Sequence, residues 1–185
     1  MRRYLTASLA ISFFAVTAAG AQQKFKLGST DIRPGGKIAA AQTFNGMDCT
    51  GTNVSPEMHW QGAPAKTKSY AFTMYDPDAP TGSGWWHWVV YNIPASATRL
   101  PTGAADPGKK LLPSGAVLGN VDVGTPTYTG PCPPKGDKAH RYIFTVYALD
   151  TDKLDVPASA TAAYVGFNIH FHQLAKATFS AMYGR

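Results

Sequence analysis

The chain has 185 residues, of which 44% are hydrophobic and 15% are charged, so the composition excludes a disordered polyampholyte and the length favours one domain. Its 14 prolines and 18 glycines indicate short strands and many turns rather than a helical bundle. The formal net charge is +6, but the lysines and arginines form no cluster or stripe, so we expect no nucleic-acid partner.

Residues 1–21 have the form of a secretory signal peptide. The start is basic, residues 5–19 are largely apolar, and an Ala-Gly-Ala sequence suited to signal peptidase ends at Ala21. The alternative is a membrane anchor, but about 15 apolar residues are short for a bilayer. We therefore expect a mature domain of residues 22–185 that begins at Gln22, has no transmembrane anchor, and is periplasmic or secreted.

The two cysteines, Cys49 and Cys132, are expected to form a disulfide if the chain is exported, because an oxidising compartment favours the single possible pairing. Closing a loop of about 80 residues would stabilise the fold by at most about 4–5 kcal/mol, less any strain in the geometry. The alternative is two buried free thiols. A zinc site is less favoured, because neither cysteine has the CxxC spacing common among zinc ligands.

Strand-like composition recurs along the mature chain. The predicted strands are 37–44, 69–75, 85–93 and 141–149, and the last two are apolar on both faces, which is typical of covered strands. Residues 101–137 are rich in glycine and proline, so we expect long loops there with at most short strands.

The pattern near the end of the chain has a helical period. A C-terminal helix capped by Asn168 is predicted, and 158–164 is a further short helix candidate. The apolar positions that define the longer helix are Phe171, Leu174, Ala175, Phe179 and Met182. A packed β-sheet domain with a C-terminal helix against it fits this order of elements.

The first segment whose side chains could bind a ligand or act in catalysis joins two predicted strands. The sequence DPDAP at 76–80 places two carboxylates at a strand exit, where both can point into one cavity. Strand alternation then puts Trp85 and His87 on one face and Trp86 and Trp88 on the other. Taken alone, such a sequence is commonly a turn, and a single histidine here is commonly a core residue.

The second segment is the proline-rich loop at 130–134 and the strand that follows it. Prolines make this loop rigid, and His140 and Tyr142 share one face of the next strand. A rigid loop beside histidine and tyrosine suits a small anion, because loop N–H groups and imidazole donors can surround its oxygens. The alternative is a stiffened connection with no ligand.

Together, these segments resemble the signature regions of the phosphatidylethanolamine-binding protein family, above all its secreted bacterial branch of Raf-kinase-inhibitor-like proteins. The resemblance runs from about residue 24 to the C-terminus. The matching strings are 53–56 (NVSP), 76–80, 85–94 and 130–142. It implies a mainly β fold, a β-sandwich of antiparallel-rich sheets with a C-terminal α-helix, and a small pocket for phosphate, acetate or a phosphorylated head group.

The resemblance also implies which residues line that pocket. These are Asp76, Asp78, Trp85, His87, Gly130, Pro131, His140 and Tyr142. Trp86 departs from the histidine found in many relatives, but alternation turns it away from the pocket. Cys132 lies inside the proline-rich loop, as in bacterial members, so the expected disulfide would brace a pocket wall.

We expect a non-enzymatic binding protein without a cofactor. Two imidazoles are natural donors to an oxyanion, most of all when protonated, and the aspartates would orient them or accept a ligand proton. No nucleophile elbow is recognisable. Action on a partner protein is a further option. The first alternative is a metal-dependent hydrolase that uses Asp76, Asp78, His87 and His140; the second is a kinase or protease inhibitor with a vestigial pocket.

Overall fold

The computed structural model describes residues 24–185, so the predicted signal peptide lies outside the described residues. In chain order the elements are β1 (Lys26–Gly28), the 3₁₀ helix η1 (Ala40–Gln42), β2 (Asn45–Gly46), β3 (Cys49–Thr50), β4 (Met58–Gln61), β5 (Ser69–Asp76), β6 (Trp85–Pro94), β7 (Arg99–Leu100), β8 (Val117–Leu118), β9 (His140–Leu149), α1 (Ala162–His172) and β10 (Gln173–Tyr183). Within this part of the chain, no helix has the length and hydrophobicity needed to cross a membrane.

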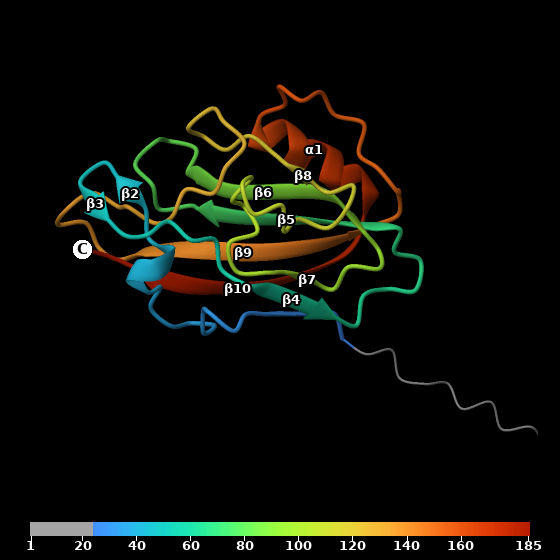
Figure 1. The fold of residues 1–185 in the computed structure, drawn as a ribbon, viewed down its shortest axis with the longest axis horizontal. Helices are drawn as coiled ribbons and strands as arrows, with labels where there is room; N and C mark the ends of the chain where they lie inside the picture. Colours follow the sequence, from blue (N-terminus) through green and yellow to red (C-terminus); the bar gives the residue numbers. More distant parts are fainter. Residues whose placement is uncertain (1–23) are drawn as a thin grey trace, which may run out of the picture.

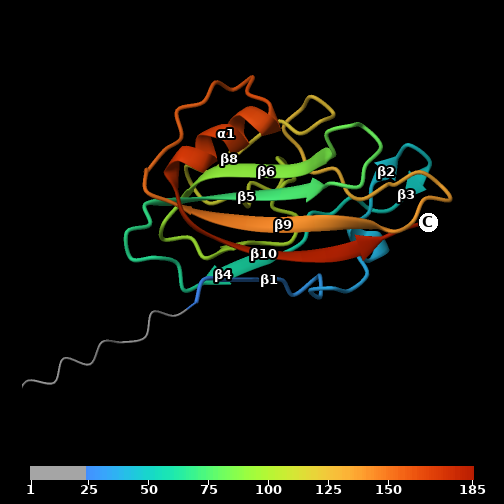
Figure 2. The same ribbon diagram turned by 180° about the vertical axis from the view of Figure 1, so that it is seen from behind.

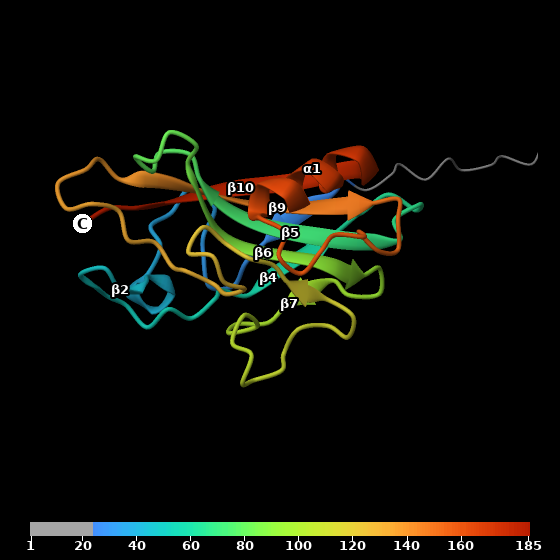
Figure 3. The same cartoon turned by 90° about the horizontal axis from the view of Figure 1, so that it is seen from above.

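The centre of the fold is a five-stranded antiparallel sheet in the order β10-β9-β5-β6-β8 (Figure 1). A second sheet has the order β1-β4-β7, and β2 pairs with β3 in a small hairpin. Figure 3 shows the large sheet between α1 on one side and strands β4 and β7 on the other. The predicted fold class, mainly antiparallel β with a helix near the C-terminus, is confirmed.

Both faces of the large sheet are buried, as the continuous apolar strands predicted. The larger core contains Phe72, Trp88 and Phe144 and lies between the two sheets. On the opposite face, Val165 and Ile169 of α1 are buried in a second core that includes strand residues. Burying a side chain of this size contributes about 1.5–3 kcal/mol.

The predicted central strands are confirmed as β5, β6 and β9, each within a residue or so of its expected bounds. The loop-rich character of 101–137 is also confirmed, since β8 is the one named strand there. The strand predicted at 37–44 is wrong. This segment contains η1, and its sheet pairing is limited to a bridge between Lys37 and Met182.

The C-terminal helix prediction is also wrong in position. The helix ends at His172, and β10 then pairs with β9 along its length (Figure 2). Its inward residues follow a period of two, with Ala177, Phe179 and Ala181 all in the larger core. The apolar residues at 171, 175, 179 and 182 fit a helical period by coincidence. The strand's alternation of buried and exposed residues is hard to recognise in the sequence, because two of its buried positions are small alanines.

The start of α1 also differs from the prediction. Thr161 is the N-cap, and its side chain accepts a hydrogen bond from Tyr164 N at 3.2 Å. Asn168 lies inside the helix, where its amide donates to Tyr164 O. The short helix predicted at 158–164 therefore overlaps only the first turn of α1.

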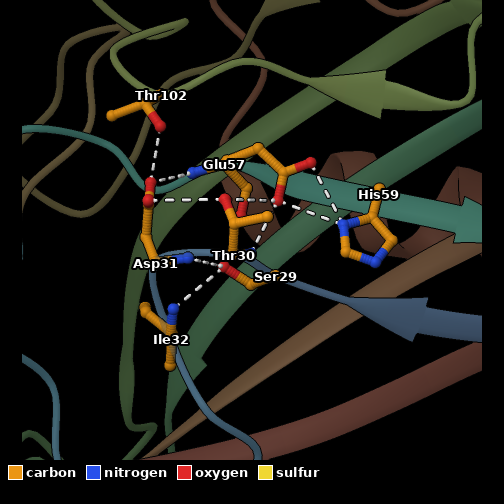
Figure 4. A network of polar contacts seen from close by, with 7 residues as sticks. All are labelled: Ser29, Thr30, Asp31, Ile32, Glu57, His59 and Thr102. Carbon is orange, nitrogen blue, oxygen red and sulfur yellow. Dashed lines mark hydrogen bonds and ion pairs between the residues drawn. The ribbon is translucent and has the colours of Figure 1, made fainter.

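A polar network ties the N-terminal segment to the body of the domain (Figure 4). Ser29 Oγ donates to Glu57 O at 2.6 Å, and Glu57 N donates to Asp31 Oδ2 at 2.7 Å. Thr102 Oγ1 donates to the same Asp31 oxygen at 2.6 Å, while His59 Nδ1 lies 3.1 Å from the buried Glu57 carboxylate. These contacts join β4 to segments on both sides of it in the sequence.

Candidate functional site

A cavity of about 190 Å³ lies where β5 ends and β6 and β9 begin. Antiparallel pairing brings these strand ends together, so that Asp76 pairs with Trp85 and lies beside His140. Six of the eight predicted residues line the cavity: Asp76, Trp85, His87, Gly130, His140 and Tyr142. The other lining residues are mainly apolar: Phe44, Met47, Ala79, Pro80, Val123, Pro133 and Pro134, with Thr81, Thr129 and Cys132.

The two remaining predicted residues do not line this cavity. Asp78 N donates to Asp76 Oδ1 at 2.8 Å, and this turn directs the Asp78 side chain elsewhere. Its carboxylate accepts hydrogen bonds from Arg141 Nε and Nη2 at 3.0 and 2.9 Å, which hold the pKa of Asp78 below its usual value. Pro131 has a structural contact, because its carbonyl accepts from Phe44 N. The expectation that both aspartates face one cavity is therefore corrected.

Asp76 orients His140. Asp76 Oδ2 lies 2.8 Å from His140 Nδ1, and both side chains are about 95% buried or more. Because the carboxylate accepts from Nδ1, the other ring nitrogen, Nε2, is available to a ligand. That Nε2 atom is 3.6 Å from Asp137 Oδ2, too long for a strong hydrogen bond. One of the two predicted aspartates thus has the orienting role expected of it.

His87 is held differently from His140. Its Nδ1 lies 2.7 Å from Thr129 O, and since a carbonyl only accepts, Nδ1 carries the proton. Its Nε2 is buried and has no hydrogen-bond partner among the described residues. Burial lowers the pKa of His87 to about 4, so the ring is neutral at pH 7 and Nε2 is an acceptor. This corrects the expectation that both imidazoles donate to an anion.

Tyr142 supplies the complementary donor. Its hydroxyl is buried near the Asp76 carboxylate and makes no hydrogen bond of good geometry with the described residues. Burial, followed by the nearby charge of Asp76, raises the pKa of Tyr142, so the hydroxyl keeps its proton at every physiological pH. The ring packs edge-on against His87, with centroids 5.2 Å apart. The cavity therefore presents a buried acceptor beside a buried donor.

A β-bulge places His87 in this position. Met74 pairs with Trp88 and Tyr75 pairs with Trp86, so His87 is an extra residue on β6. Trp86 lies on the far face against Tyr75, as alternation predicted. Trp88 instead joins the same side as His87, within the larger core, so the alternation prediction is wrong for this residue.

Close backbone packing and a disulfide build the wall opposite the strands. Gly130 N donates to Asn53 Oδ1 at 2.8 Å, and a Cβ at Gly130 would overlap the Gln42 carbonyl oxygen. No side chain larger than that of glycine fits there. The expected disulfide between Cys49 and Cys132 is confirmed and joins this wall to β3.

Residues 28–184 match the family model described as phosphatidylethanolamine-binding protein. The chain belongs to the phosphatidylethanolamine-binding protein family. Among curated relatives, the UPF0098 protein YbhB of Escherichia coli strain K12 is 51% identical, with 85% of this chain and 99% of YbhB covered. The UPF0098 protein YbcL of the same organism is 44% identical, with 97% of each chain covered.

Solved structures agree with this family assignment. The crystal structure of E. coli YbcL, described as a new member of the mammalian family, superimposes with a TM-score of 0.85 at 45% identity, covering 89% of this chain and 99% of that one. A homolog from Chlamydia trachomatis, CT736, gives a TM-score of 0.72 at 29% identity, covering 87% and 97%. The phosphatidylethanolamine-binding protein of Plasmodium vivax shares the fold at 16% identity and a TM-score of 0.55, covering 92% and 90%.

The cavity of this family member also contains residues that sequence reasoning missed. The Thr129 carbonyl accepts a hydrogen bond from His87 Nδ1, and Phe44 and Met47 form part of the cavity wall. Phe44 and Met47 could have been found from the predicted disulfide, because it places the segment before Cys49 beside the proline-rich loop. Nothing in the sequence pattern singled out Thr129.

The metal alternative lacks a geometric basis in residues 24–185. Three of the four proposed ligands line the cavity, but the fourth, Asp78, is bound by Arg141, and both Asp76 oxygens already accept hydrogen bonds. In this part of the chain, no group of three or more histidine, cysteine or acidic side chains is arranged to hold an ion.

Proposed function

We propose that this family member is a non-enzymatic binding protein whose cavity takes a small monoanion with one acidic proton, such as singly protonated phosphate or a phosphorylated head group. The observation that carries the proposal is the buried pair of unpartnered polar atoms, His87 Nε2 and Tyr142 Oη. Unsatisfied buried polar groups cost about 1–3 kcal/mol each, so a ligand that satisfies both gains that energy.

The chemistry of the pair defines the ligand. A protonated phosphate oxygen donates to His87 Nε2, while an anionic oxygen accepts from the Tyr142 hydroxyl. When His140 carries protons on both ring nitrogens, Nδ1 donates to Asp76 and Nε2 donates to the anion. A fully ionised phosphate has no O–H group to donate to His87 Nε2, and the negative charge of Asp76 repels it. No lysine or arginine is among the described residues that line the cavity, so nothing offsets a second negative charge. The site therefore favours a monoanion.

The family name supports a phosphorylated head group as one form of this ligand. Phosphoethanolamine is a phosphate monoester, and such esters lose their last proton at about pH 6. The disulfide supports a site of action outside the cytoplasm, in the periplasm or after secretion, where disulfides persist. A chain acting there would meet free phosphate and soluble phosphate monoesters, both of which carry such a proton.

Calorimetric titration tests the proposal. Inorganic phosphate and phosphoethanolamine should each bind more tightly at about pH 5.5 than at about pH 8, because the ligand gains its proton while His87 stays neutral. Tyr142→Phe removes only the hydroxyl and should weaken binding by about 1.5–3 kcal/mol, the range for hydrogen bonds to charged groups. His140→Ala should have an effect of similar size.

The control is His170→Ala, an exposed histidine on α1 that does not line the cavity. It should bind both probes as the unmodified protein does. Equal affinities of all the proteins at both pH values would show that the anion binds elsewhere or not at all.

A further inference from the structure

The mouth of the cavity is formed by a hairpin with an unusual turn. The Met47 hairpin, defined as residues 45–50, joins β2 to β3 through Met47 and Asp48, whose φ angles are 49° and 62°. Two consecutive left-handed residues make the tight turn that normally uses Asn-Gly or Gly-Gly, so methionine is strained here. The Met47 side chain lines the cavity and is 66% exposed, which places it at the opening. A strained turn at this position needs contacts that hold it.

Arg185 provides those contacts. Its guanidinium donates from Nη1 to Asp48 O at 2.8 Å and from Nη2 to Met47 O at 3.3 Å, so it binds both carbonyls of the turn. Its Nε donates to Pro133 O at 2.7 Å on the facing wall of the cavity. Figures 1 and 2 both show the C-terminus beside β2 and β3, at the end of the sheet where β10 finishes. One planar group therefore spans the two sides of the mouth.

The disulfide joins the same two segments in a different way. Cys49 follows the strained turn and Cys132 precedes Pro133, so the covalent link limits how far the segments can separate. It does not fix the direction of the turn carbonyls. A guanidinium presents its donors in a rigid plane, and three hydrogen bonds from that plane fix orientation as well as distance.

We propose that Arg185 is a positioning residue that holds the Met47 hairpin against the Pro133 wall and so sets the width of the cavity mouth. The effect on ligands rests on the proposed function, because it requires that the cavity binds an anion. Without Arg185 the turn relaxes, the Met47 side chain no longer covers the opening, and a bound anion escapes faster.

Hydrogen exchange and phosphate titration on the mature, disulfide-bonded protein test this role. Arg185→Ala should speed amide exchange in residues 45–50 at least about tenfold and weaken phosphate binding by about three- to tenfold. Arg185→Lys keeps the charge but lacks the planar fork, so both effects should be intermediate. Arg99→Ala is the matched control, since Arg99 is an exposed arginine of β7 outside the cavity. It should match the unmodified protein in both measurements.

The two readouts separate this inference from the proposed function. Unchanged exchange at residues 45–50 in Arg185→Ala would overturn the positioning role, whatever the phosphate result. Faster exchange with unchanged phosphate affinity would overturn it too, because the hairpin would then not control the mouth. If the unmodified protein binds no phosphate, faster exchange confined to the hairpin supports the positioning role, and the proposed function is the part that fails.

Discussion

Burial of His87 makes the stability of the fold depend on pH between about 4 and 6.5. The pKa of this histidine is about 4 in the folded chain, against its ordinary value of 6.5, because the ring is desolvated. Between these values the unfolded chain binds a proton that the folded chain does not, so the free energy of unfolding falls as the pH falls. The full difference corresponds to about 3 kcal/mol, and most of it is lost by about pH 4.5. Above pH 6.5 the contribution is fully present.

Urea unfolding of the ligand-free protein at about pH 7.5 and pH 4.5 measures this effect. His87→Gln removes the titrating group while its amide can still donate to Thr129 O. Carboxylates titrate alike in both proteins, so the unmodified protein should lose about 2–3 kcal/mol more than the variant on acidification.

The exposed His170→Gln serves as the control, and it should show the same pH dependence as the unmodified protein. Identical pH dependence in His87→Gln would refute the reasoning. A His87 titration near pH 6.5 by NMR, or a proton on Nε2 instead of Nδ1, would refute it as well.

Three further predictions concern the framework of the site. Reduction of the Cys49–Cys132 disulfide, which joins residues 83 apart, should lower stability by about 4–5 kcal/mol, measured as a lower urea midpoint with reductant; an unchanged midpoint would contradict the loop-closure argument. Gly130→Ala forces a Cβ onto Gln42 O and should abolish soluble expression or cost at least about 3 kcal/mol, and wild-type stability would be incompatible with the close packing. N-terminal sequencing of protein from fractionated cells should find Gln22 first in the periplasm or medium, whereas recovery of the uncleaved chain from the cytoplasm would reject export.

The sequence correctly predicted the strands whose own composition is typical of buried β-structure. The central strands are rich in aromatic and β-branched residues, and their burial on both faces followed from continuous apolar composition. Six cavity residues were predicted through the family resemblance carried by two motifs at strand ends, and antiparallel pairing brings those ends together in the structure. Asp76 and His140 are 64 residues apart, yet each is the terminal residue of its strand.

Where the prediction failed, tertiary contacts outweighed the local pattern. Residues of β10 fit a helical period, but their backbone groups pair with β9 and their alanines fill the core. Strict alternation along β6 missed the bulge at His87, since a bulge depends on register with the neighbouring strand. Asp78 was predicted to line the cavity, but its carboxylate instead pairs with Arg141, which lies 63 residues away in the sequence.

The walls of the cavity come from segments far apart in the sequence, and this makes the lifetime of the protein depend on the supply of its ligand. Its walls come from the hairpin near residue 47, the ends of β5 and β6, and the loop and strand around residue 140. A partly folded chain lacks at least one wall, so any ligand of this cavity binds only the complete fold. A ligand at a hundred times its Kd would stabilise that fold by about 2.7 kcal/mol. Proteases act on opened chains, so a cell rich in the ligand would keep this protein longer than one deprived of it.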